Sequence, residues 1–146
     1  MSNEKNKVLV RQFFEAFQAG DVDEMFSLFA DDSTWWVLGK PNQFLSAGPK
    51  DLATIKGLIK DLFFETIMPD GVTFNIKSLT AEDNRVSAEV DGRGVTSTGF
   101  VYDQNYHFLI EFENGKIKQL KEFLDTIHAR EAFENVPGDH PEAPSA

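Results

Sequence analysis

The stretch YHFLIEFENGKIKQLKEFLDT, residues 106–126, predicts a β-hairpin in the C-terminal part of the chain. Two runs rich in aromatic and branched side chains flank the sequence ENG at 113–115, and a short glycine-containing turn between such runs favours antiparallel pairing. Side chains alternate between the two faces of a strand. Each strand should therefore present one set of side chains to the interior and the other to solvent.

Alternation identifies the interior face of the first strand, which is expected to span 99–113. Its odd-numbered set includes Asp103, Asn105, His107 and Glu111, whereas its even-numbered set is mostly aromatic. We therefore predict that the even-numbered set faces the core. Its members are Phe100, Tyr102, Gln104, Tyr106, Phe108, Ile110 and Phe112.

Glu122 is the unusual residue of the second strand, because it lies between two leucines on one face. Leu120, Glu122 and Leu124 share that face, while Gln119 and Lys121 belong to the other. Glu122 is therefore predicted to point inward. Burial removes hydration from a carboxylate and raises its pKa unless cations or donors compensate, which is the profile of a general acid or base.

The two ionisable residues that follow are expected to have structural roles. Asp125 suits the N-cap of a short helix over 127–134, because its carboxylate can accept hydrogen bonds from the first backbone amides. His128 lies inside that helix.

The rest of the chain supplies helices first and strands afterwards. Gly20 suits the end of the first helix and Asp21 the start of the second. This order favours an α+β domain in which a curved antiparallel sheet carries its helices on one face. The expected helices cover 4–19, a short stretch after Asp21 that contains Met25, Phe26, Leu28 and Phe29, and 50–65. The expected strands before the hairpin cover 33–38, 72–80 and 85–94.

The strand over 85–94 has two possible orientations. Val86, Ala88 and Val90 form an apolar set, and alternation alone would turn that set inward. If the strand lines a cavity, its polar set becomes the lining and the valines cover the outer face. Periodicity leaves both orientations open. The polar set is Ser87, Glu89, Asp91 and Arg93.

Composition narrows the class of function. The chain has 146 residues, 41% of them hydrophobic, a formal net charge of -10 and no cysteine. Such an acidic surface repels phosphate backbones and anionic membranes, so neither nucleic acid nor a membrane is an expected partner. The N-terminus shows no signal peptide or membrane span, and a cytoplasmic location is expected. No metal-ligand spacing, phosphate loop or other cofactor motif is present, so neither a metal nor another cofactor is predicted.

Residues 1–134 are predicted to form one domain, and the proline-rich residues 135–146 a disordered tail. The chain holds fourteen Phe, two Trp and two Tyr, which suits either an aromatic core or a deep apolar cavity.

Three features together resemble the nuclear transport factor two-like superfamily, and within it the SnoaL-like polyketide cyclase and ketosteroid-isomerase-like group. They are the opening FFEAFQAGDVDEMFSLFADDSTWW at 13–36, the final hairpin at 106–126, and the order of elements between them. The resemblance implies a conical α+β barrel, a pocket between curved sheet and helices, and a homodimer. Because this scaffold carries many chemistries, it indicates the fold more specifically than the activity.

Few of the family's functional residues are present at the corresponding positions of this chain. Ketosteroid isomerases have a tyrosine and an aspartate where this chain has Phe13 and Val37, so that machinery is missing. Limonene epoxide hydrolases position a water with a tyrosine and an asparagine, which correspond to Trp35 and Val37. Their last-strand aspartate corresponds to Glu122, as does the acid of the polyketide cyclases.

The epoxide hydrolases also carry an Arg-x-Asp pair on a middle strand, where this chain has Glu89 and Asp91. The match favours an orientation in which these two acids point inward. Alternation alone would instead turn the apolar set of that strand inward. The arginine is absent, so the resemblance does not imply epoxide hydrolysis of that type.

We therefore predict Glu122 and Asp91 as the catalytic pair of an enzyme that acts on a hydrophobic cyclic small molecule by isomerisation, cyclisation or hydration. Two alternatives stay open: a non-catalytic ligand-binding or dimerisation module, and an accessory protein whose pocket is filled by its own Phe and Trp side chains. The predicted binding residues are Trp35, Val37, Phe13, Phe17, Glu89, Arg93, Gln104, Tyr106, Phe108, Leu120 and Leu124.

Overall fold

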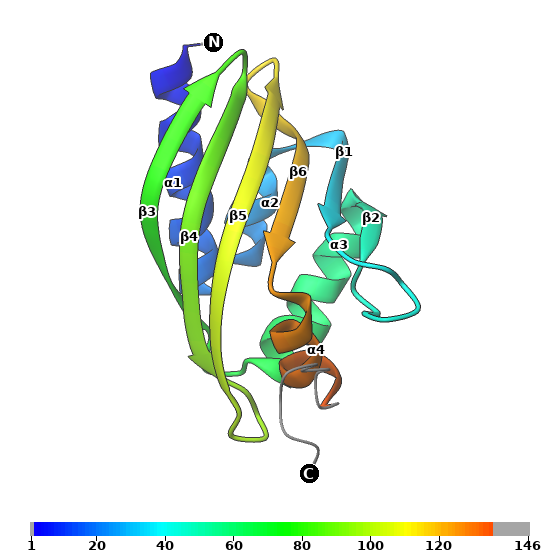
Figure 1. The fold of residues 1–146 in the computed structure, drawn as a ribbon. Coiled ribbons are helices and arrows are strands. Elements are labelled where there is room, and N and C mark those ends of the chain that lie inside the picture. Colours follow the sequence, from blue (N-terminus) through cyan, green and yellow to red (C-terminus); the bar gives the residue numbers. More distant parts are fainter. Residues whose placement is uncertain (1, 136–146) are drawn as a thin grey trace.

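A computed structural model describes residues 2–135, which form an α+β fold built on one six-stranded sheet. The predicted tail lies outside the described residues, apart from Asn135. Figure 1 shows the sheet with its helices packed behind and beside it. The elements are α1 (Asn3–Ala19), α2 (Val22–Ser27), β1 (Phe29–Val37), β2 (Gly48–Asp51), α3 (Leu52–Gly57), the π-helix η1 (Leu58–Ile67), β3 (Val72–Glu82), β4 (Arg85–Val95), β5 (Val101–Glu113), β6 (Lys116–Leu124) and α4 (Thr126–Glu134).

The sheet has the order β2-β1-β6-β5-β4-β3, and its four C-terminal strands pair antiparallel as predicted. One pair differs from the fully antiparallel sheet expected, because β1 runs parallel to β6 and makes the sheet mixed. These two strands are distant in sequence and no tight turn joins them. Turn signals, which predict only neighbouring pairs, could not reveal their direction.

Local capping explains where most helices begin and end. Gly20 ends α1 with φ 71°, a left-handed conformation that glycine adopts without steric cost. The carboxylate of Asp21 accepts a hydrogen bond from the backbone N–H of Glu24, and that of Asp125 accepts one from His128 at the start of α4. These three predictions are confirmed.

The helix predicted over 50–65 is wrong at its start and in its type. Lys50 and Asp51 belong to the short edge strand β2, and the helix divides into α3 and the wider π-helix η1. The pattern hid β2 because the strand has only four residues and contains Gly48 and Pro49, which are uncommon in strands. This correction matters, since β2 places Lys50 on the sheet.

The core lies between α1 and the interior face of the sheet, and β5 is oriented as predicted. Tyr102, Gln104, Tyr106, Phe108 and Ile110 are all buried. From the helix side, Val10, Phe13, Phe14 and Phe17 are buried, and the Phe14 ring packs edge-to-face on Phe108 with centroids 5.1 Å apart.

The register of β4 with β5 decides the orientation that periodicity left open. Val90 pairs with Tyr106, and Glu89 pairs with the exposed His107. Directly paired residues share a face, so the buried aromatic set of β5 places Val86, Ala88 and Val90 inside. The inward orientation of the Glu89 and Asp91 face, which the resemblance favoured, is therefore wrong.

Candidate functional site

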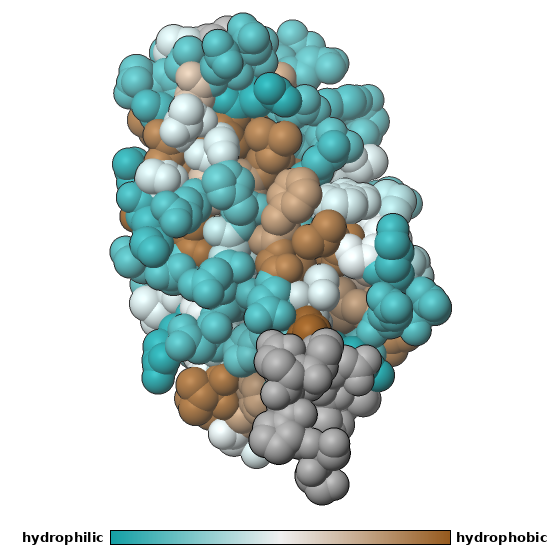
Figure 2. All heavy atoms as spheres, in the orientation of Figure 1, coloured by the Kyte–Doolittle hydropathy of each residue, from teal (hydrophilic) through white to brown (hydrophobic). Residues whose placement is uncertain are grey.

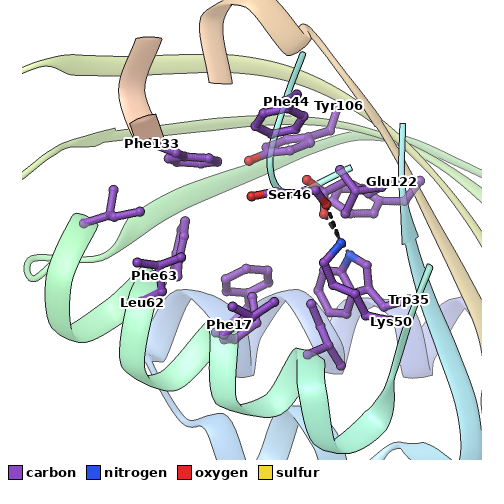
Figure 3. A pocket seen from close by; sticks show the side chains of 16 residues that line it. Phe17, Trp35, Phe44, Ser46, Lys50, Leu62, Phe63, Tyr106, Glu122 and Phe133 are labelled. Atoms are coloured by element: carbon purple, nitrogen blue, oxygen red, sulfur yellow. Dashed lines mark hydrogen bonds between the residues drawn. The ribbon is translucent and has the colours of Figure 1, made fainter. Parts of the chain in front are cut away.

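A cavity of about 80 Å³ opens between the interior face of the sheet and helices α1, η1 and α4. Aromatic and branched side chains form most of its wall, as the close view in Figure 3 shows. The polar groups of the lining come from Ser46, Lys50, Tyr106 and Glu122. The apolar side chains include Phe17, Ile59, Leu62, Phe63, Ile67 and Phe133.

Glu122 projects from β6 into this cavity. Its Oε1 accepts a hydrogen bond of 2.9 Å from the indole N–H of Trp35, which holds the carboxylate against the sheet wall. Burial raises the pKa of Glu122 to about 7, although the Trp35 hydrogen bond and the charge of Lys50 both lower it. A carboxyl group in this environment exchanges its proton near neutral pH.

Strand pairing explains why Trp35, Lys50 and Glu122 meet. On β1, Trp35 and Val37 lie two residues apart and therefore share a face. Lys50 of β2 pairs with Trp35 on one side of β1, and Glu122 of β6 pairs with Val37 on the other. The parallel β1–β6 pairing thus assembles the polar end of the cavity.

The two tyrosines of β5 form a second polar feature. Their hydroxyl oxygens lie 2.5 Å apart in a hydrogen bond, with Tyr106 at the cavity wall and Tyr102 fully buried behind it. Burial, reinforced by the neighbouring tyrosine and the charge of Glu122, holds the pKa of Tyr106 well above its ordinary value. Tyr106 therefore presents a neutral hydroxyl.

The pKa of Glu122 predicts a pH-dependent contribution to stability. Between its ordinary value of 4.5 and about 7, the folded protein keeps a proton on Glu122 that the unfolded chain has lost. The contribution of this group to the free energy of unfolding therefore falls as pH rises through that window. Glutamine does not titrate, so the variant lacks this loss. Urea unfolding should therefore show that Glu122→Gln gains stability relative to wild type when the pH is raised from about 5 to about 8. A constant difference between the two proteins would contradict the raised pKa.

Six of the predicted site residues line the cavity, and four others pack in the core. Phe13, Leu120 and Leu124 are buried without reaching the cavity. Gln104 instead fastens β5 to the start of α4: its side chain donates to the carbonyl of Asp125 and accepts from the Asp125 N–H. The six that line the cavity are Phe17, Trp35, Val37, Tyr106, Phe108 and Glu122.

Glu89, Asp91 and Arg93 lie on the opposite face of the sheet. Asp91 accepts a hydrogen bond from the Asn105 side chain and pairs with Lys77, which also pairs with Glu89. Arg93 pairs with Asp103 on that face. Asp91 therefore cannot act with Glu122 as a catalytic pair, and the predicted pairing of these two acids is corrected.

Sequence reasoning missed the contributions of Lys50, Phe44 and Phe133. Phe133 reaches the wall from α4, and Phe44 from the segment between β1 and β2. No local periodicity marks such positions. For Lys50, an N-cap signal at Asp51 was available: Asp51 caps α3, which puts the preceding residue outside the helix.

The described part of the chain shows neither a metal-binding cluster nor a membrane-spanning helix. Within residues 2–135, no group of three or more His, Asp or Glu side chains is arranged to hold a metal ion. No helix in that range is long and apolar enough to span a membrane.

Comparison with known proteins agrees with this architecture. A SnoaL-like domain model matches residues 10–120, and the chain belongs to that family. No curated protein gave a significant match.

Solved structures share the fold at low identity. A putative isomerase from Bacillus subtilis is 23% identical, with a TM-score of 0.78 over 95% of this chain and 100% of its own. An NTF2-like protein of unknown function from Burkholderia pseudomallei is 19% identical, with a TM-score of 0.76 over 91% and 98%. An LEH-like epoxide hydrolase from M. tuberculosis is 14% identical, with a TM-score of 0.71 over 91% and 92%. At these identities the likeness shows the fold alone.

Proposed function

We propose that this protein is an enzyme that moves a proton on a hydrophobic cyclic small molecule, without a cofactor and with Glu122 as its acid and base. One observation carries the proposal: a carboxyl group with a pKa of about 7 faces an aromatic-lined cavity. A general acid or base works best when its pKa lies near the working pH.

The two oxygens of Glu122 have different environments. Oε1 is held by the Trp35 indole, whereas Oε2 has no hydrogen-bond partner among the described residues. Oε2 is therefore the oxygen available to a substrate. The fixed Oε1 limits rotation of the carboxylate, which keeps Oε2 in place for proton transfer.

The cavity is too small to enclose a whole ring, so its wall must open for a cyclic substrate to reach Glu122. Its volume of about 80 Å³ is less than the roughly 150 Å³ of an engineered cavity that admits benzene. The wall is not sealed, since Leu62 is 41% exposed and Phe63 and Phe133 are half-buried. A substrate would place one ring near Glu122 and extend past these side chains.

Deuterium exchange tests the proposal on simple carbon acids, whatever the natural substrate is. Two ring-containing carbon acids, phenylacetone and 2-tetralone, would be incubated with the protein in D₂O, and loss of their α-proton signals would be followed by NMR. We expect exchange faster than in buffer with free glutamate. Absence of exchange with both compounds, together with an ordinary pKa of Glu122 in a ¹³C titration, would contradict the proposal.

The second candidate function is a ligand-binding module without catalysis. It is favoured by the position of Asp91 on the opposite sheet face, which leaves Glu122 without a second acid in the cavity lining. The same ¹³C titration separates the two functions. A pKa of Glu122 at or below the ordinary value favours binding alone, and one near 7 favours catalysis.

We also propose that the protein forms a homodimer through the outer face of the sheet. Figure 2 shows hydrophobic residues running through the largely hydrophilic face turned toward the viewer. Trp36 and Phe123 pack edge-to-face there, with ring centroids 5.3 Å apart, and Val95 and Val101 are 49% and 48% exposed. Light scattering at micromolar concentration should give twice the monomer mass, and Phe123→Glu should reduce it. A monomeric wild-type protein would contradict the dimer.

A further inference from the structure

A second hollow lies outside the cavity, between α4 and the segment that joins β1 to β2. Its volume is about 340 Å³, and small-molecule sites usually measure roughly 300–1,000 Å³. Phe44, which is 2% exposed, belongs to the walls of both the hollow and the cavity. Since none of the polar residues of the cavity lines the hollow, the hollow is a separate site.

The two walls of the hollow are held together at both ends of α4. At the start of the helix, Gly39 has φ 127°, and a Cβ atom there would lie 3.2 Å from Cβ of Ala47 and 3.5 Å from Cγ2 of Thr126. The missing side chain lets the segment pass close to the helix. At the end of the helix, the backbone N–H of Leu45 donates a hydrogen bond of 2.9 Å to the carboxylate of Glu134.

The charged side chains that line the hollow are both cations, Lys40 and Arg130. Neither forms an ion pair within residues 2–135. Gln43 and Thr126 add an amide and a hydroxyl, and the carboxylate of neighbouring Asp125 is engaged by the backbone N–H of His128. The planar fork of an arginine matches the oxygens of a carboxylate or a phosphate, so this lining suits an oxyanion.

The net charge of -10 favours a small anion over a large one. Charges on a protein surface are screened over about 8 Å at physiological ionic strength. A small anion in the hollow therefore interacts mainly with the two cations in its wall, whereas a polyanion would also meet the acidic surface outside. Phe44 and Ile127 supply apolar contacts beside the cations, which suits an organic anion.

We propose that this hollow binds a small organic oxyanion, a carboxylate or a phosphate monoester, which Lys40 and Arg130 hold between them. The inference goes beyond the proposed function and does not depend on Glu122. Lys40 belongs to the segment that carries Phe44, and Arg130 belongs to the helix that carries Phe133. Because both aromatic residues line the cavity, a bound anion also ties together two parts of the cavity wall.

Calorimetry with two aromatic anions, phenyl phosphate and benzoate, tests the site, with benzyl alcohol as the neutral counterpart. Wild-type protein should bind at least one of the anions with one-to-one stoichiometry, and the tighter of the two identifies the headgroup. Arg130→Met should weaken that binding by about 10- to 100-fold, the value of a charge-assisted hydrogen bond. Lys40→Met should weaken it by roughly 2- to 5-fold, because the charge of an exposed lysine is screened by solvent.

Matched controls separate the hollow from general electrostatics and from the cavity. Lys56→Met removes a cation from an exposed position of α3 outside the hollow and should leave the affinities unchanged. In ¹⁵N NMR spectra the anion should shift the backbone amides of Thr126 and Ile127, and leave the indole N–H of Trp35 in place. Thermal melting would confirm that each variant is folded, and the anion should raise the Tm of wild type more than that of Arg130→Met.

Several results would overturn the inference. Wild-type protein that binds neither anion would do so, as would equal affinity in wild type and Arg130→Met. An equal loss in Lys56→Met would show that only the net charge matters. Shifts confined to the Trp35 indole would place the probe in the cavity instead. Because no readout involves Glu122, this site can fail while the acid/base role stands, and that role can fail while anion binding persists.

Discussion

Glu122→Gln is expected to lower the rate of deuterium exchange on any carbon acid that the wild-type protein turns over by about 10²- to 10⁴-fold. Glutamine keeps the shape of the side chain, and its amide oxygen can still accept the hydrogen bond that the Trp35 indole donates to Oε1. What it removes is the group that accepts and returns a proton. The fold should therefore persist while proton transfer is lost.

The chain offers matched controls for this substitution on the opposite face of the sheet. Glu89→Gln and Asp91→Asn make the same kind of change outside the cavity, where both acids pair with Lys77. Both variants should exchange deuterium at the wild-type rate. If Glu122→Gln kept its activity, Glu122 would not be the acid/base. If Asp91→Asn lost activity in a folded protein, the site would extend beyond the cavity to the outer face.

Gly94→Ala is expected to destabilise the protein by about 1–3 kcal/mol, the usual cost of forcing extra atoms into a packed region. A Cβ atom at Gly94 would lie 2.6 Å from the backbone oxygen of Gly71 and 2.9 Å from the methyl carbon of Met68. A backbone oxygen cannot move aside as a flexible side chain can. The turn before β3 would therefore have to shift, and urea unfolding would measure the cost.

Gly57→Ala is the control for this prediction. Gly57 ends α3, and a Cβ atom there would meet nothing within 4 Å. Alanine at such a helical position should be neutral or stabilising, by up to about 1 kcal/mol. If Gly94→Ala were as stable as Gly57→Ala, the close approach of β4 to Gly71 would be contradicted.

The sequence determined the features that depend on contacts near in the chain. The strongly unequal faces of β5 placed its aromatic set inside, and the two leucines beside Glu122 placed that acid inside as well. Caps at Asp21 and Asp125 were predictable because a cap acts on backbone groups within one helical turn. For the same reason, the antiparallel hairpins followed from short turns.

Tertiary structure alone decided the features that depend on distant pairing. Alternation along β4 favoured an outward Asp91 and the family resemblance an inward one, and the register of β4 with β5 decided for the outward orientation. The parallel pairing of β1 with β6, and the pairing of short β2 with β1, brought Lys50 and Glu122 to the same end of the cavity. These residues are far apart in the chain, and local propensity carries no information about which distant strands meet. The sequence therefore identified the acid, and the fold supplied the cation beside it.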